Sequence, residues 1–355
     1  MTESTRSARA SHHGGAVTGA AGTYVTARRG RSADGPRANE VVVMSGPVST
    51  ADAPAPRTDA GRPAAACVEV SPSREATVGR ITVRRALPRK KRRTVGAWCF
   101  ADHMGPADVT ENSGLDIGPH PHIGLQTVTW LVDGQVLHRD SLGSEQVIEP
   151  GQLNLMTAGH GVSHSEEATG HYRGVLEGIQ LWVALPEETR HGPAAFEHHA
   201  DLPRTDLGAG AATVLVGRFG GLTSPARHDT PLVGVDLDLR ATADVPLRTD
   251  FEYALVVLRG AVAVDGEPLV PGRLGYLGEG RDELRIEVRE PSRLLLLGGE
   301  PFPEPVLMWW NFVARTEQEI DAAYDSWTAQ DDRFGRVRSS LPRMPVGVPP
   351  WRRTG

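Results

Sequence analysis

Residues 252–277 read EYALVVLRGAVAVDGEPLVPGRLGYL: a strand, a Gly turn, a second strand, a Pro-Gly turn and a third strand. Alternation with a period of two, interrupted by turn residues, is typical of β-strands with one buried face. Residues 125–159 follow the same order of strands and turns without close sequence identity. Two blocks with one pattern predict a duplicated β-barrel, the first block ending near residue 205 and the second starting near 212.

Further strand-like runs continue the pattern on both sides of these blocks. They are GIQLWVAL (178–185), VLVGRF (214–219), GVDLDL (234–239) and SRLLLLG (292–298). The chain has 40 Gly and 27 Pro among its 355 residues, and this turn-rich composition favours β architecture over helical bundles. One segment, residues 316–330, breaks the pattern. It begins with Thr316 and has Glu319 three positions later, which is the capping-box signature of a helix start.

The pattern divides the chain into four parts. Residues 1–77 form an Ala/Gly/Arg-rich extension that we expect to be disordered, because such a segment buries too little apolar surface to offset its ordering entropy. The first barrel domain is predicted over 78–208, and the second over 209–337 with the helix included. The tail is 338–355. Translation can start at Met1 or at Met44, and the sequence leaves both open.

The charges are distributed unevenly along the chain. Residues 1–93 contain 17 Lys and Arg against 7 Asp and Glu, whereas the remainder contains 21 against 37. An acidic body is not expected to bind nucleic acid directly. The basic run 84–93 is interpreted as a solvated loop between strands. No apolar run reaches the roughly 18 residues of a membrane span, and no apolar segment follows Arg28-Arg29 as an export signal requires, so a cytoplasmic protein is expected.

Histidines carry the chemistry of this sequence. Ten of the thirteen lie between His103 and His199, and two form a tight pair in GPHPHIGLQTVTW (118–130). Side chains at i and i+2 of a strand face the same side, so His120 and His122 can reach one ion. His164 and Glu166 in TAGHGVSHSEE (157–167) repeat this geometry. One His-x-His pair is usually surface decoration, but two such pairs predict a four-ligand metal site suited to Fe(II), Mn or Ni.

Two of these stretches resemble the metal-binding motifs of the pirin family, within the cupin superfamily: HPHIGLQTVTWLVDG (120–134) and PGQLNLMTAGHGVSHSE (150–166). The resemblance extends over about 78–337, through RRALPRKKRRTVGAWCFADHMGPADV (84–109), GIQLWVALP (178–186) and GEPFPEPV (299–306). It implies an all-β bicupin of two double-stranded β-helix, or jelly-roll, barrels. It also implies an iron site in the first barrel with the ligands His120, His122, His164 and Glu166. Iron(II) is the expected cofactor, with Mn, Ni or Zn as alternatives.

The sequence departs from the family pattern at several positions. Many cupins have Glu four residues after the second His of the pair, but this chain has Gln126, which can only form hydrogen bonds. The second block has no His pair, and Asp250 and Glu252 alone do not make a convincing site, so a metal-free second barrel is expected. His103 in FADHMGP is a candidate pocket residue. His138, followed by Asp140, is expected to support the metal ligands from behind.

Two functions from different classes follow from the resemblance. The first is a quercetin dioxygenase that binds a flavonol at the metal and cleaves its ring with release of carbon monoxide; Glu166 is then both a ligand and the catalytic acceptor of the substrate proton. The alternative is a redox-responsive regulatory protein that binds a transcription factor or a metabolic enzyme. A third reading is a scaffold in which the metal only stabilises the fold.

Overall fold

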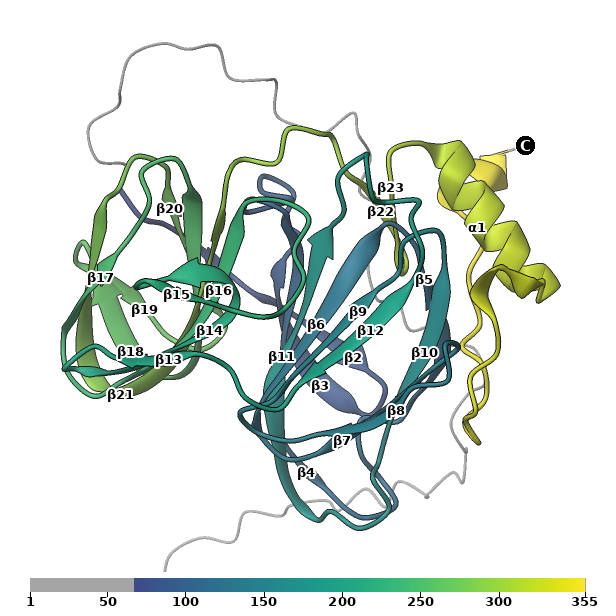
Figure 1. The fold of residues 1–355 in the computed structure, drawn as a ribbon, viewed down its shortest axis with the longest axis horizontal. Coiled ribbons are helices and arrows are strands. Elements are labelled where there is room, and N and C mark those ends of the chain that lie inside the picture. Colours follow the sequence, from purple (N-terminus) through teal and green to yellow (C-terminus); the bar gives the residue numbers. More distant parts are fainter. Residues whose placement is uncertain (1–66, 355) are drawn as a thin grey trace, which may run out of the picture. The chain divides into compact units, whose positions relative to one another are not determined.

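Two antiparallel β-barrels and one α-helix make up residues 67–354, the part of the chain that this computed structural model describes (Figure 1). A seven-stranded and a four-stranded sheet form the first barrel, and a ten-stranded sheet forms the second. All pairings between the named strands are antiparallel. The architecture confirms the predicted all-β bicupin with a C-terminal helix.

The first barrel has a seven-stranded wall in the order β12-β9-β6-β11-β4-β3-β2 and a four-stranded wall in the order β5-β10-β7-β8. The strands of the larger wall are β2 (Arg74–Val78), β3 (Ile81–Leu87), β4 (Trp98–Val109), β6 (Leu125–Asp133), β9 (Leu153–Thr157), β11 (Gly174–Ala184) and β12 (Ala195–His199). Those of the smaller wall are β5 (Ile117–His122), β7 (Val136–Asp140), β8 (Glu145–Ile148) and β10 (Val162–Glu167). Apolar side chains from both walls form one buried cluster between them.

The second barrel follows the order β1-β20-β18-β21-β16-β14-β13, with β15, β17 and β19 paired to β14, β21 and β18. Its strands are β1 (Glu69–Pro72), β13 (Arg204–Asp206), β14 (Gly210–Phe219), β15 (Leu222–Thr223), β16 (Leu232–Leu239), β17 (Ala243–Pro246), β18 (Glu252–Val264), β19 (Glu267–Leu269), β20 (Arg273–Gly278) and β21 (Glu283–Gly299). The repeated sequence block therefore folds as β18, β19 and β20.

Strand β6 shows how the two barrels fit together. Its sequence LQTVTWLVD is buried along almost its whole length. Val128 and Trp130 belong to a buried cluster that contains residues of both barrels, whereas Leu131, on the alternate face, belongs to the cluster inside the first barrel. A strand buried on both faces suits the β-branched and aromatic residues found here.

Trp98 at the start of β4 ties the first barrel to the second. Its side chain is fully buried, and its indole Nε1–H lies 3.1 Å from the carbonyl oxygen of Val233 and 3.2 Å from that of Gly298. Glu252 adds a second link, because its carboxylate accepts a 2.7 Å hydrogen bond from the backbone N–H of Gly96. The junction therefore combines apolar burial with satisfied polar groups.

The chain crosses between the barrels at both of its ends. β1 joins the sheet of the second barrel by pairing with β20. Near the other end, the hairpin of β22 (Leu307–Trp309) and β23 (Phe312–Ala314) packs on the first barrel, and Phe312 forms a bridge with Ile123. The predicted second domain, which extends to residue 337, therefore includes a hairpin that packs on the first barrel. Sequence pattern does not report such long-range contacts.

The boundary predicted at residue 77 is also too late. β1 and β2 already form strands between Glu69 and Val78. The sequence of β1, EVSP, is short and carries a charge and a proline, so local pattern does not mark it as a strand. The rest of the predicted extension, residues 1–66, lies outside the described residues.

The C-terminal helix α1 (Glu317–Ala329) starts where the capping box predicts. The hydroxyl of Thr316 accepts a hydrogen bond from the backbone N–H of Glu319, and Ile320, Ala323 and Trp327 are buried. The short helices η2 (Asp332–Phe334) and η3 (Pro350–Thr354) follow. Residues of the predicted tail, including Met344 and Trp351, pack against the cluster that contains the helix. Among residues 67–354, no helix has the length and apolar character needed to cross a membrane.

The basic run 84–93 is not a uniformly solvated loop. Arg85 lies on β3 and is 1% exposed. Its guanidinium forms hydrogen bonds of 2.8 and 2.7 Å with the two carboxylate oxygens of Asp102 and lies over the ring of Phe100. Arg93 is also buried. The alternation of β3 places Arg85 inside the barrel because its neighbours Arg84 and Ala86 occupy the other face.

We expect Trp98→Phe to lower the free energy of unfolding by about 2 kcal/mol, because it removes the indole donor from two buried carbonyl groups. Urea denaturation at equilibrium measures this loss. Trp351→Phe is the matched control: it also removes an indole hydrogen bond, to Asp321, but from a half-buried side chain. Equal losses in the two variants would contradict the proposed role of Trp98.

Candidate metal centre

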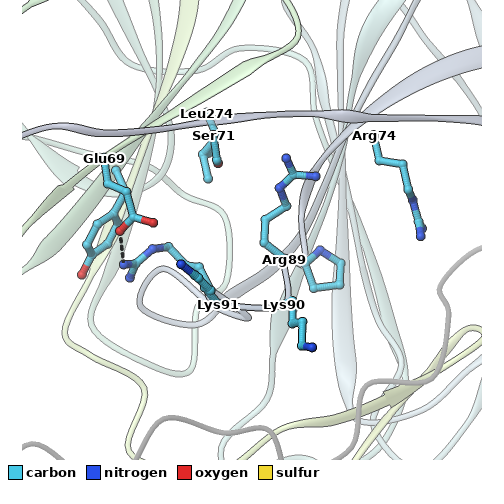
Figure 2. A pocket seen from close by; sticks show the side chains of 10 residues that line it. Glu69, Ser71, Arg74, Arg89, Lys90, Lys91 and Leu274 are labelled. Atoms are coloured by element: carbon cyan, nitrogen blue, oxygen red, sulfur yellow. Dashed lines mark hydrogen bonds and ion pairs between the residues drawn. The ribbon is translucent and has the colours of Figure 1, made fainter.

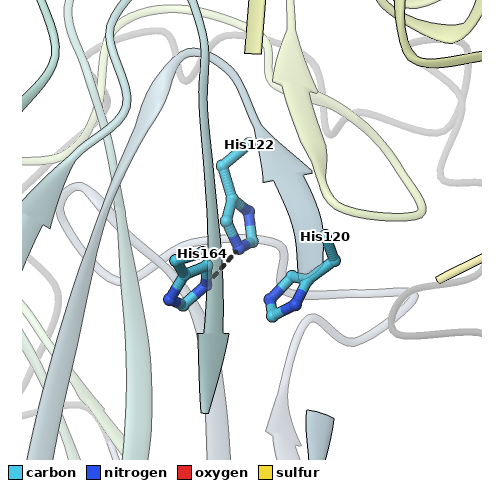
Figure 3. A group of neighbouring side chains, drawn as sticks. All are labelled: His120, His122 and His164. Atoms are coloured by element: carbon cyan, nitrogen blue, oxygen red, sulfur yellow. Dashed lines mark hydrogen bonds between the residues drawn. The ribbon is translucent and has the colours of Figure 1, made fainter. Parts of the chain in front are cut away.

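Strands β5 and β10 bring three histidines together inside the first barrel (Figure 3). His120 and His122 occupy alternate positions of β5, and the register pairs His164 of β10 with His120. One ring nitrogen from each residue lies within 4.8 Å of the other two, and each residue is 1% exposed. The structure therefore confirms that these three predicted ligands converge.

Hydrogen bonds donated by the Nδ1 atoms orient the rings of His120 and His122. Nδ1 of His120 is 2.9 Å from the carbonyl oxygen of Gly118, and Nδ1 of His122 is 2.9 Å from that of Asn311. A carbonyl oxygen can only accept, so both Nδ1 atoms carry the proton in these contacts. Each Nε2 then keeps a free lone pair, which is the tautomer that a metal ligand needs.

His164 is oriented by a second histidine and a carboxylate. Its Nδ1 lies 3.4 Å from Nδ1 of His138, whose Nε2 lies 3.3 Å from Oδ2 of Asp140. If His138 donates to Asp140, its Nδ1 can accept the proton of His164, and Nε2 of His164, which lies 3.1 Å from Nε2 of His122, carries no proton. Burial would raise the pKa of Asp140, but hydrogen bonds from His138 and Ser144 outweigh it and hold that pKa below its usual range. His138 and Asp140 therefore lie behind His164, and their role in supporting the ligand stays a prediction.

The three imidazoles are neutral at physiological pH. Burial lowers the pKa of His120 to about 4, despite the hydrogen bond to Gly118. Burial, reinforced by the neighbouring histidines, holds the pKa values of His122 and His164 well below the usual range. Three neutral nitrogen donors facing one point form a donor set for a divalent metal, because no proton has to be displaced from them.

Glu166 follows His164 by two residues and pairs with His138 across β7 and β10. A bulge shifts the register with β5 between His164 and Glu166. Its carboxylate lies outside the group of three histidine nitrogens. The residue is 3% exposed, no described residue donates a hydrogen bond to it, and burial raises its pKa to about 7. A buried carboxylate without a partner is costly unless a cation approaches it, so the donor set fits a metal. Its role as the fourth ligand stays a prediction.

Two other predicted pocket residues lie away from the histidine group. His103 is buried with Nε2 3.0 Å from Oε1 of Glu177, and Oε2 of Glu177 accepts a hydrogen bond from Arg259 of the second barrel. Gln126 donates to the hydroxyl of Thr157 at 3.0 Å and shares its face of β6 with Val128, which faces the second barrel. Both side chains therefore serve the junction between the barrels.

Aromatic side chains on the opposite wall contact the histidines, and the sequence analysis did not identify them. The ring of Trp182 lies edge-on to His122 with centroids 5.2 Å apart. Phe196 is stacked on His138 with centroids 4.4 Å apart. The alternation of apolar and polar residues in β11 and β12 could have indicated which side chains face inward. It could not have indicated that these strands lie opposite the metal motifs.

A row of polar side chains crosses the same wall. Successive register pairs connect Arg85, Asp102, Gln180, Thr129, Asn154 and His198. Gln180 lies two residues before Trp182 on β11, and His198 lies two residues after Phe196 on β12. The row therefore faces the same interior as these aromatic side chains. Nη1 of Arg85 and Nδ2 of Asn154 are buried donors with no hydrogen-bond partner among residues 67–354. These atoms are available to a polar group inside the barrel.

The C-terminal segment closes the histidine end of the barrel. Besides Asn311, it contributes the carbonyl oxygen of Phe334, which accepts from Ser163 Oγ at 2.8 Å, and the N–H of Met344, which donates to the carbonyl of Pro119 at 2.9 Å. A Cβ at Gly118 would overlap the carbonyl oxygen of Pro342. A glycine beside the metal motif was therefore the sequence signal for this close backbone approach.

The second barrel uses its corresponding acidic residues differently. The carboxylate of Glu252 accepts from the hydroxyl of Tyr276 at 2.6 Å as well as from Gly96. Asp250 pairs with Arg248. The metal-free second barrel stays a prediction.

Comparison with known proteins assigns the chain to a family. The pirin family model matches residues 80–183, and the model for the pirin C-terminal cupin domain matches 232–335. The chain belongs to the pirin family. The first match contains all four predicted ligands, and the second covers most of the second barrel, the hairpin and α1.

Pirin-family relatives cover most of this chain. A Pseudomonas aeruginosa protein named "Putative quercetin 2,3-dioxygenase" is 47% identical over 277 residues, 77% of this chain and 88% of that one. A pirin-like protein of Caulobacter vibrioides is 37% identical over 72% of this chain and 91% of its own length. The crystal structure of quercetin 2,3-dioxygenase from Acinetobacter baumannii matches with a TM-score of 0.78 and 44% identity, over 80% of this chain and 96% of that one.

We expect metal binding to release a proton from Glu166 in a pH-dependent manner. With a pKa of about 7 in the metal-free protein, Glu166 is mostly protonated at pH 6 and mostly ionised at pH 8. Cobalt(II) binding should then release about 0.9 proton from this group at pH 6 and about 0.1 at pH 8. Calorimetry in buffers of different ionisation enthalpy measures the number.

Glu166→Gln serves as the reference, since it keeps the shape of the side chain without the ionisable group. The wild type should exceed this variant by about one proton at pH 6 and by almost none at pH 8. The same proton release from both proteins at pH 6 would exclude Glu166 as a ligand.

Proposed function

We propose that this pirin-family protein is an iron-dependent dioxygenase that cleaves a flavonol such as quercetin with release of carbon monoxide. The observation that carries the proposal is the convergence of three buried, neutral histidines beside an unpartnered carboxylate. The names of the Pseudomonas and Acinetobacter relatives support this substrate class. Manganese, nickel and zinc accept similar donors and are the alternatives to iron.

The residues of the metal site would have different roles in this reaction. His120, His122, His164 and Glu166 would hold the ion, which supplies a Lewis acid for the adjacent hydroxyl and carbonyl oxygens of a flavonol. Glu166, with a pKa of about 7, is suited to accept the hydroxyl proton near neutral pH. His138 and Asp140 keep the ring of His164 in position while the proton moves.

The opposite wall offers contacts for the rest of the substrate. Trp182 and Phe196 present aromatic faces or edges near the histidines. One pleat farther along, the free donors of Arg85 and Asn154 are suited to the hydroxyl groups of a flavonol. Each histidine is 1% exposed, so a substrate would have to displace protein atoms to reach the metal, and the segment that contains Asn311 contacts the site directly.

The dioxygenase proposal predicts multiple turnovers of carbon monoxide release from quercetin and oxygen by protein loaded anaerobically with Fe(II). His164→Ala should lose at least about 100-fold in turnover, because it removes a ligand. His171→Ala, an exposed histidine outside the site, is the matched control and should retain full activity. Circular dichroism checks that both variants fold.

No carbon monoxide from wild-type protein with full iron occupancy would reject this chemistry for quercetin. Equal turnover in wild type and His164→Ala would place the activity elsewhere.

A second candidate function is regulation through the state of the metal, and the closure of the site favours it. The carbonyl of Asn311 links the ring of His122 directly to the C-terminal segment. A change in the charge of the ion would therefore act on a segment that also contacts Ser163 and Pro119. The conformation of the C-terminal segment would then depend on the state of the metal, and a partner protein could bind one conformation preferentially.

The regulatory function predicts that amide exchange in residues 307–344 differs between the metal-free, Fe(II) and Fe(III) proteins. Metal should slow exchange in this segment, and Fe(II) and Fe(III) should differ by at least about threefold, because each state stabilises its docking differently. Hydrogen exchange with mass spectrometry measures the rates. Identical exchange in all three states would eliminate regulation by this route.

A further inference from the structure

A cavity with a volume of about 380 Å³ lies away from the histidines, between the edge of the second barrel and a loop of the first (Figure 2). The second barrel contributes β1 and β20 to its wall. The first barrel contributes Arg74 of β2 and four consecutive basic residues, Arg89 to Arg92. Figure 2 shows Arg89, Lys90 and Lys91 between Glu69 at the left and Arg74 at the right.

The cavity has far more positive than negative charge. Glu69 is the only carboxylate in its lining, and Arg92 already binds it at 3.2 Å while lying over the ring of Tyr276. Within residues 67–354, no ion pair joins a carboxylate to Arg74, Arg89, Lys90 or Lys91, whereas about half of the other arginines have such a partner. Four cations in one cavity therefore lack a counter-charge.

The backbone holds these cations in place. Arg89 and Arg92 exchange reciprocal backbone hydrogen bonds of 2.7 and 3.1 Å, which close a tight turn with Lys90 and Lys91 at its tip. Partial burial and the nearby charge of Arg74 lower the pKa of Arg89. The turn and β2 therefore place like charges on one side of the cavity, and an anion bound there would reduce their repulsion.

We propose that this cavity is a binding site for a compact multivalent anion of the phosphate type. Basic side chains around a concave site and a preorganised turn are suited to phosphate oxygens. The chain after residue 93 contains 37 acidic and 21 basic residues, so its net charge is negative. A long polyanion such as nucleic acid would extend over this acidic surface, whereas a small anion contacts only the cavity. The site is independent of the metal centre and of the function proposed for it.

Inorganic pyrophosphate is the probe, titrated calorimetrically into the full-length, metal-loaded protein at constant ionic strength. Wild type should bind one equivalent. Arg74→Gln and Arg89→Gln should each weaken binding at least about tenfold, since each removes a charge that faces the anion. All variants keep the metal site, so any heat from chelation of the metal is common to them. Arg218→Gln is the matched control, because Arg218 lines a different cavity, of about 350 Å³, on the second barrel. This variant should bind pyrophosphate as tightly as the wild type does.

Thermal unfolding gives a second readout that a merely structural arginine would not produce. Without pyrophosphate, Arg89→Gln should melt at or above the temperature of the wild type, because it relieves repulsion. With pyrophosphate, the melting temperature should rise more for the wild type than for the variant.

Absence of saturable binding to wild type would overturn the proposal, as would unchanged affinity in both cavity variants. An equal loss in Arg218→Gln would also overturn it, because the effect would then be one of overall charge. Tighter binding of a 20-base-pair duplex at the same residues would overturn the compact anion as the ligand.

Discussion

The pairing of His164 with His120 across strands β10 and β5 is the constraint on which the rest of the metal centre depends. In this register, His122 lies beside them and the three rings share one face of the four-stranded wall. A slip by one residue would turn the side chain of His164 to the opposite face. The pairing of β10 with β7 adds His138 behind His164, so the ligand and its support are set by the same strand.

Burial prepares the histidines to bind a metal, and it also costs free energy at Glu166. Removal from water keeps the three imidazoles neutral and ready to bind a metal, but it leaves the carboxylate of Glu166 without a partner. A divalent cation offsets this cost, which couples metal binding to the stability of the barrel. The C-terminal segment completes the burial, because Asn311 orients His122 from outside the barrel. The second barrel covers the outer face of the first, and Trp98 of the first barrel donates a hydrogen bond to Val233 of the second.

Local sequence pattern was sufficient for the strands, the helix cap at Thr316 and the three histidines, because each depends on spacing within one element. It was not sufficient where the choice lay between two faces of a strand. Asp102 and His103 are adjacent, so one of them had to face inward, and only the packing shows that it is Asp102. Burial of Arg85 depends on that same partner across the sheet. The strand β1 and the segment around Asn311 could not be predicted, because each contacts residues that are distant from it in the sequence.

The most direct test of the central claim is an anomalous diffraction map from crystals of the cobalt-loaded protein. The account predicts one strong peak about 2 Å from Nε2 of His120, His122 and His164 and from a carboxylate oxygen of Glu166. A peak ligated by the histidines with Glu166 turned away would contradict the four-ligand site. A peak at another position would contradict the metal centre as a whole.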